Sequence, residues 1–91
     1  MCLNWRMIQL AITETILRRR LASNVRARRT AADLTIKQAA SGAKLHWRHW
    51  QKIEAGQNNA TLFTLARVAD VLEVDPSDLF LEPRAFASRA S

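Results

Sequence analysis

A chain of 91 residues has the length of one small domain, because two halves of it would each be too short to bury a core. Apolar residues make up 48% and charged residues 24%, which excludes an intrinsically disordered chain. The single cysteine, Cys2, excludes an internal disulfide and a cysteine-based zinc site. The net charge of +6 is uneven, since residues 1–54 hold eleven basic and three acidic side chains and residues 55–91 hold three and five. The positive half predicts a partner with a phosphate backbone or an anionic surface, unless it is only a solvated basic face.

Good helix formers dominate the composition, which includes only two Gly and two Pro. No stretch approaches the roughly 20 apolar residues of a spanning helix. The basic cluster at residues 18–20 follows the apolar start, which is the reverse of a secretory signal. We therefore expect an all-α, cytoplasmic protein for which a membrane is not the partner.

Residues 3–21 are predicted to form an extra N-terminal helix. A stripe of six residues follows a 4-3-4-3-4 spacing along it: Leu3, Met7, Leu10, Glu14, Leu17 and Leu21. Four more apolar residues are expected beside this stripe: Trp5, Ile8, Ile12 and Ile16. So wide an apolar face must pack on the domain, on a second copy or on a membrane surface, unless the natural protein starts at Met7 or later. Of these, we favour a second copy.

Shorter helices are predicted after this segment. Residues 21–31 form the first, which ends at Asp33 because Asp tolerates the left-handed conformation. Thr35 is expected to cap a helix over residues 36–41. A break near Lys44 precedes a helix over residues 46–55, which carries Trp50 and Ile53 on the face expected to meet the core and stops at Gly56.

The C-terminal half predicts two more helices. Thr61 is a capping candidate for a helix with apolar residues at core spacing through residue 72. The run Asp75-Pro76-Ser77-Asp78 is typical of a helix start and predicts a short final helix. Residues 82–91 lack periodicity and are expected to form a flexible tail.

Several short motifs occur in a definite order along residues 21–80. They are Arg29, Leu34-Thr35, Ala39-Ala40, Ile53-Glu54-Ala55-Gly56, residues 61–72 and residues 75–80. In this order and spacing they resemble the Cro/CI-type helix-turn-helix family, also called XRE-like or lambda-repressor-like regulators. The resemblance implies a five-helix domain over residues 21–81 with an extra N-terminal helix in an extension over residues 1–20. It also implies a sequence-specific regulator, repressor-like, of double-stranded DNA that acts as a homodimer.

The resemblance also assigns roles to residues. The recognition helix, about residues 46–55, would enter the major groove, and the residues expected to contact bases are Trp47, Arg48, Gln51 and Lys52. Those expected to contact phosphates are Thr35, Lys37, Gln38, His46, Asn58 and Asn59. Arginine can bind guanine and glutamine can bind adenine in bidentate fashion, which suits these roles. For Trp47 the alternative is a half-buried core position. Arg29 and Glu54 are expected to form a structural ion pair.

The chain departs from the family pattern at several positions. Lys44 and Glu73 stand where glycine is frequent, Ile36 replaces a frequent glutamine and Ala39 a frequent leucine, which leaves space for Trp50. These changes leave the predicted fold intact, but they put the phosphate contact of the missing glutamine in doubt.

Other functions have less support in the sequence. His46 and His49 are too few to hold a metal ion, and no catalytic grouping or glycine-rich phosphate loop is evident. We therefore expect no enzyme activity, cofactor, metal or small-molecule substrate. A different class of function remains open, namely a protein-binding antitoxin or adaptor that binds its partner through residues 3–20 and uses the helix-turn-helix only secondarily.

Overall fold

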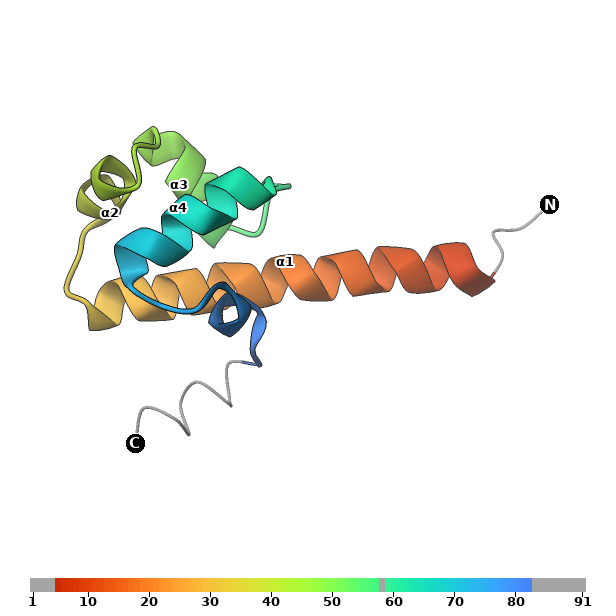
Figure 1. The fold of residues 1–91 in the computed structure, drawn as a ribbon. Coiled ribbons are helices and arrows are strands. Elements are labelled where there is room, and N and C mark those ends of the chain that lie inside the picture. Colours follow the sequence, from red (N-terminus) through yellow and green to blue (C-terminus); the bar gives the residue numbers. More distant parts are fainter. Residues whose placement is uncertain (1–4, 58, 83–91) are drawn as a thin grey trace.

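The structure is a computed structural model that describes residues 5–57 and 59–82. It contains four α-helices, α1 (Trp5–Ala31), α2 (Ile36–Gly42), α3 (Trp47–Glu54) and α4 (Leu62–Leu72), followed by a short 3₁₀ helix, η1 (Pro76–Phe80) (Figure 1). No strand is present in these described ranges. The expected all-helical class is confirmed, and the last predicted helix has 3₁₀ geometry.

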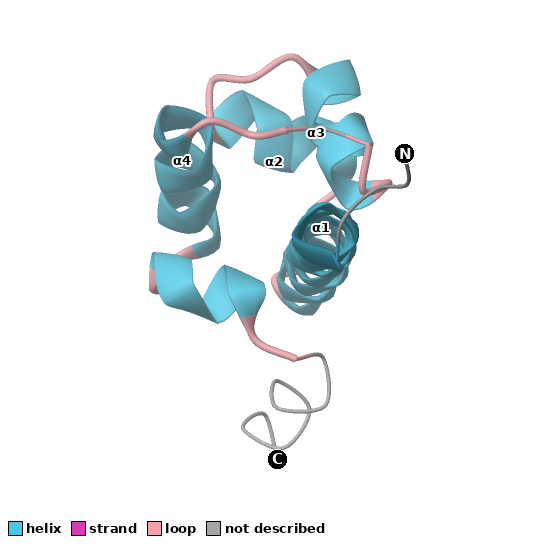
Figure 2. Ribbon diagram, turned by 90° about the vertical axis from the view of Figure 1, so that its right-hand side faces the viewer, coloured by secondary structure: helices cyan, strands magenta, loops and turns pink. Residues whose placement is uncertain are grey.

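The other helices pack around the C-terminal half of α1, and its N-terminal half projects away from them (Figure 1). Seen along the axis of α1, they all lie on one side of it, with α2 and α3 at one end of the molecule and η1 at the other (Figure 2). One long helix therefore serves both as a wall of the domain and as an arm.

Side-chain caps and left-handed residues fix the helix boundaries. Thr35 caps α2 as predicted, and a complete capping box forms because the Thr35 hydroxyl accepts from the Gln38 N–H while the Gln38 side chain accepts from the Thr35 N–H. Thr61 caps α4, also as predicted. Asp33 takes the left-handed conformation expected of it, with φ 60°.

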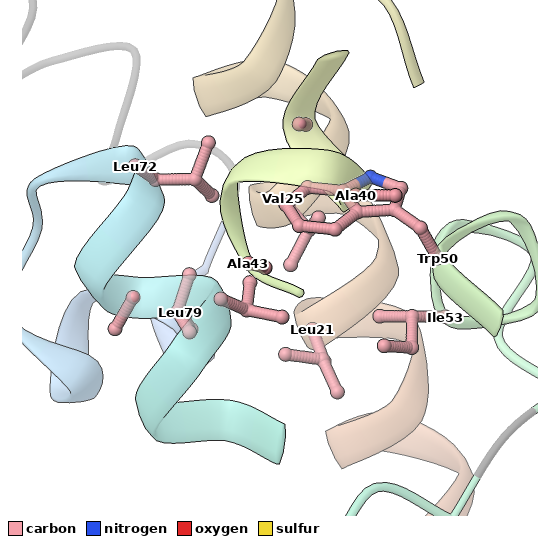
Figure 3. Close-up of a cluster of buried hydrophobic side chains, with 11 residues drawn as sticks. Leu21, Val25, Ala40, Ala43, Trp50, Ile53, Leu72 and Leu79 are labelled. Carbon is pink, nitrogen blue, oxygen red and sulfur yellow. The ribbon is translucent and has the colours of Figure 1, made fainter. Parts of the chain in front are cut away.

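The core lies where all four α-helices and η1 meet. The largest of its fully buried side chains is Trp50, which Figure 3 shows among Val25, Ala40 and Ile53. Small residues on α2 let its backbone approach its neighbours closely. At Gly42 the approach is close enough that a Cβ atom would lie 2.6 Å from Val71 Cγ2.

One buried polar residue on α1 forms hydrogen bonds to η1 and to the residue that follows it. Asn24 on α1 donates from Nδ2 to the carbonyl oxygens of Leu79 at 3.0 Å and Leu81 at 2.6 Å. A buried amide needs such partners because burial without hydrogen bonds is costly. Asn24 was not predicted to be buried. In the sequence it stands next to Leu21, Ala22 and Val25, which are all buried, and this position among apolar residues would have indicated it.

The extra N-terminal helix is not confirmed as a separate element. Residues 5–31 form one continuous helix, and the predicted boundary between residues 20 and 21 lies inside it. The physical reason is that residues 17–25 contain no Gly or Pro, and only Ser23 and Asn24 favour caps, so nothing interrupts the helix. Leu3 and most of the predicted tail, residues 83–91, lie outside the described residues.

The projecting part of α1 has two apolar faces rather than one wide face. With about 100° per residue, Met7, Leu10 and Leu17 lie on the side that carries the core residue Leu21. The second set points to nearly the opposite side, about 170° around the helix, and comprises Trp5, Ile8, Ile12 and Ile16. The prediction that this second set widens the first stripe is therefore wrong.

Both faces of the arm are exposed, with Trp5 and Leu10 each 70% accessible, so the arm does not fold back onto its own domain. In residues 5–57 and 59–82 no helix is long and apolar enough to cross a bilayer.

Candidate nucleic-acid interface

The turn between α2 and α3 is held by backbone and side-chain contacts. Lys44 adopts the left-handed conformation with φ 58°, and the next residue, Leu45, donates its N–H to the Ala40 carbonyl at 2.8 Å. Arg67 on α4 donates to the Lys44 carbonyl at 3.2 Å and lies over the Phe63 ring at 4.2 Å. These contacts hold a conformation that costs about 1–2 kcal/mol for a residue with a Cβ atom.

Helix α3 has a buried face and an exposed face. Trp50 and Ile53 face the core, as predicted from the sequence. Arg48, Gln51 and Lys52 are exposed on the outer face, where they line one shallow groove together with residues 55 and 57. The structure therefore brings together three of the four residues predicted to contact bases.

Trp47, the fourth, is half-buried and packs against the core. Its ring stacks on His46 at a centroid distance of 5.7 Å. Lys37 Nζ lies 5.6 Å and Arg48 Cζ 5.3 Å from the centre of the ring, so both cations interact with its π face. The ring thus links α2 to α3 and helps to hold two cations of the outer face in place.

The residues predicted to contact phosphates are not all alike. Thr35 and Gln38 use their side chains in the capping box, whereas Lys37 is exposed on the same first turn of α2. His46 caps α3: its Nδ1 accepts from the Arg48 N–H at 3.1 Å, which leaves Nε2 available to the solvent. Asn59 lies in a groove at the root of the arm, away from α3, and Asn58 lies outside the described residues.

Arg29 and Glu54, predicted from the sequence to pair, form a bidentate contact. Arg29 Nε donates to Glu54 Oε2 at 2.6 Å and Nη2 to Oε1 at 3.0 Å, while Nη1 donates to the Leu34 carbonyl at 2.8 Å. The hydrogen bond to Glu54 raises the pKa of Arg29, so the guanidinium stays charged. Trp50 Nε1 donates to the same Glu54 oxygen, Oε2, at 2.5 Å. This bond was not predicted, although the i, i+4 spacing of Trp50 and Glu54 in the sequence would have indicated it.

Cations on the outer face of α2 and α3 keep their charge unpaired. Within the described part of the chain, no carboxylate forms an ion pair with Lys37, Arg48 or Lys52. Exposed donors on one face of a helix preceded by a tight turn can bind an anionic, hydrogen-bonding surface.

A comparison with protein-family models matches residues 20–80 to the family described as a helix-turn-helix domain. The chain belongs to the helix-turn-helix domain family. No match was found among the curated proteins.

Solved structures agree with this assignment. The restriction-modification controller protein C.AhdI from Aeromonas hydrophila is 27% identical, with a TM-score of 0.67, over 69% of this chain and 96% of that one. A hypothetical transcription factor, NHTF, from Neisseria is 24% identical, with a TM-score of 0.77, over 86% of this chain and 88% of that one. The clp gene regulator ClgR from Corynebacterium glutamicum is 23% identical, with a TM-score of 0.69, over 81% and 80%. The last two likenesses show the shared fold alone.

Proposed function

We propose that this helix-turn-helix protein is a cytoplasmic, sequence-specific regulator of transcription that binds double-stranded DNA with α3 in the major groove and acts as a repressor. The observation that carries the proposal is the outer face of α3, where Arg48, Gln51 and Lys52 are exposed and share one groove. The regulators of similar fold support the same class of function. No enzyme activity is part of the proposal.

Direct reading of bases is assigned to the outer face of α3. Arg48 would bind guanine O6 and N7, and Gln51 would bind adenine N6 and N7, since these pairs match in bidentate geometry. Lys52 would bind guanine or a phosphate. The half-buried Trp47 would present only its edge to a thymine methyl group or a sugar.

Contacts to the DNA backbone are assigned to the flanking elements. The residues in this role are Thr35, Lys37, Gln38, His46, Asn58 and Asn59. Since the Thr35 and Gln38 side chains are occupied in the capping box, their contribution would come mainly through backbone N–H groups at the start of α2.

Selection of binding sites from random duplexes tests this proposal. We expect a defined motif at moderate salt. Arg48→Ala should weaken binding to that motif by about 1–3 kcal/mol and relax specificity at one position. Lys37→Ala should weaken binding to all sequences alike and reduce the salt slope by about 0.9. Failure to recover any motif would contradict the proposal.

We also propose that two copies bind DNA together. One module of this kind buries only about 600–1,000 Å² on DNA, and a dimer places two recognition helices about 34–36 Å apart along one side of the duplex. The arm of α1 is the proposed interface, because the side of it that continues from Leu21 carries the exposed apolar side chains of Met7, Leu10 and Leu17. Deleting residues 1–17 should convert a dimer into a monomer by mass in solution. A truncated chain that stays dimeric would exclude this interface.

A second candidate function uses the same arm for a different partner, as an antitoxin or adaptor would. It is favoured by the low charge of the arm, in which Arg6 and Glu14 are the only charged side chains between residues 5 and 17. The two candidates differ in solution: a full-length chain that is monomeric at tens of micromolar, yet binds a second protein through residues 3–20, would favour the adaptor.

A further inference from the structure

The seven arginines of α1 fall into two groups in the structure. Four of them form ion pairs, Arg18 with Glu14, Arg20 with Glu82, Arg28 with Asp78 and Arg29 with Glu54. Across residues 5–57 and 59–82, no carboxylate pairs with Arg19 or Arg26, and both side chains are exposed. Arg6, in the arm, is likewise exposed and unpaired among these residues. The charges of Arg19 and Arg26 are therefore available to an external partner.

Arg19, Ser23 and Arg26 form one line of donors, which we call the arginine stripe. Their spacing of four and then three residues places them on one side of α1, where they line a groove against Ala55 and Gly56 at the end of α3. Ser23 is exposed, and its hydroxyl has no hydrogen-bond partner among the described residues. The stripe thus presents two cations and a hydroxyl.

The acidic residue in this groove does not cancel the stripe. Both oxygens of Glu54 accept from Arg29, one of them accepts from Trp50 as well, and its side chain is only 8% exposed. An anion in the groove would therefore meet Arg19 and Arg26 without a competing free carboxylate.

The groove of the arginine stripe adjoins the groove on the outer face of α3. Ala55 lines both, so the surface runs from Arg48 and Lys52 across the end of α3 to Arg26 and Arg19. The two arginines are about 10 Å apart along α1, at 1.5 Å per residue. Phosphates of one strand recur about every 3.4 Å along the duplex axis, so a duplex that ran parallel to α1 would place about three phosphate steps along the stripe.

We propose that the arginine stripe binds the phosphate backbone of the DNA that flanks the site read by α3. This inference rests on the proposed function and adds a second set of contacts to it. Backbone contacts position a protein on the duplex and raise its affinity, but they carry no sequence information. The stripe should therefore act alike on every sequence.

The test measures the dissociation constant against salt concentration for full-length Arg19→Ala, Arg26→Ala and the double variant. Each duplex is used in two forms, the selected motif and a scrambled sequence. One lost phosphate contact lowers the slope of log K against log salt by about 0.9, which corresponds to roughly fivefold weaker binding at 0.15 M salt for each copy bound. For each copy bound, the double variant should lose about 1.8 in slope on both duplexes.

Arg20→Ala is the matched control, because it removes the same charge from the same helix at a side chain that pairs with Glu82 and does not line the groove. Since the charge of Arg20 is already paired, the slope of this variant should stay close to that of the wild type. Arg26→Lys should retain the slope, since a phosphate accepts a point charge from either residue. Unchanged thermal melting of all variants would show that the fold is intact.

Several outcomes would contradict the proposal that the arginine stripe binds phosphates. Slopes of Arg19→Ala and Arg26→Ala equal to that of Arg20→Ala would contradict the phosphate contact, and a loss confined to the selected motif would indicate base reading instead. A wild type without sequence preference would refute the proposed function, yet the slopes on the scrambled duplex would still test the stripe. A wild type that binds neither duplex would refute both.

Discussion

Replacing Glu54 with alanine tests how much the contacts of Glu54 on α3 with Arg29 on α1 and with Trp50 stabilise the domain. The substitution removes the acceptor of Trp50 Nε1, a group on a side chain with no exposed surface, and an unsatisfied buried donor costs about 1–3 kcal/mol. It also leaves the Arg29 guanidinium, whose side chain is 13% exposed, without its carboxylate. Breaking a buried ion pair from one side costs about 3–5 kcal/mol. Because Arg29 keeps its bond to the Leu34 carbonyl, we expect a total loss of about 3–5 kcal/mol rather than the sum of both terms.

Urea unfolding followed by circular dichroism measures this loss. A domain of this size has a total stability of about 5–14 kcal/mol, so the expected loss is a large fraction of it. With a slope of about 1–2 kcal/mol per molar urea, the midpoint should fall by about 1.5–5 M. In the double variant with Arg29→Ala, the losses should be less than additive by about 1–3 kcal/mol, because the two side chains act on each other.

Glu14→Ala provides the matched control. Glu14 also pairs with an arginine, Arg18, but their side chains are 48% and 36% exposed and lie one helical turn apart. Exposed pairs of this kind contribute about 0.3–0.5 kcal/mol, so the midpoint should hardly move. If Glu54→Ala and Glu14→Ala destabilised the protein to within about 1 kcal/mol of each other, the argument from burial would be refuted.

Three further substitutions test the backbone and the caps. Gly42→Ala places a methyl group 2.6 Å from Val71 Cγ2 and should cost about 1–3 kcal/mol in urea unfolding, and a cost that did not fall in a Val71→Ala background would contradict this contact. Lys44→Gly relieves the left-handed lysine and should raise stability by about 0.5–1 kcal/mol, seen as a higher melting temperature, whereas a lower one would refute the strain. Hydrogen bonds from the Ser77 hydroxyl and N–H lower the pKa of Asp75, so its contribution to stability is present above the carboxyl's ordinary pKa and is lost as pH falls through the lowered value. The stability gap between wild type and Asp75→Asn should therefore narrow between pH 5 and pH 2, and a constant gap would contradict this.

Features that depend on local chemistry were predictable from the sequence. Thr35 and Thr61 precede the first apolar residues of their helices, and their hydroxyls cap those helices. The apolar spacing of Trp50 and Ile53 placed both in the core. In each case the deciding interaction lies within about four residues, so neighbouring residue types are enough to indicate it.

Two kinds of feature were harder to predict: the positions of residues around a helix axis, and contacts between segments that are distant in the sequence. The continuity of α1 follows from the lack of any helix-breaking residue between residues 17 and 25, but the family resemblance, which begins at residue 21, suggested two segments. Within the arm, residues two positions apart, such as Leu10 and Ile12, point about 160° apart around the helix axis. A count of apolar residues in the segment does not distinguish these two directions. The position of Trp47 between Lys37 and Arg48 depends on how α2 packs against α3, which no local pattern encodes.

The uneven charge of the sequence corresponds to an uneven distribution of charge between the two ends of the folded domain. Acidic residues of the C-terminal half, Asp78 and Glu82, pair with arginines of α1 near η1, so much of the positive charge there is neutralised. Figure 2 places η1 at the opposite end of the molecule from α2 and α3, where Lys37, Arg48 and Lys52 have no carboxylate partner among the described residues. A field with its positive end at α2 and α3 would turn that end toward a polyanion before any specific contact forms. The ion pairs that stabilise one end of the domain thereby also define which end a duplex would meet first.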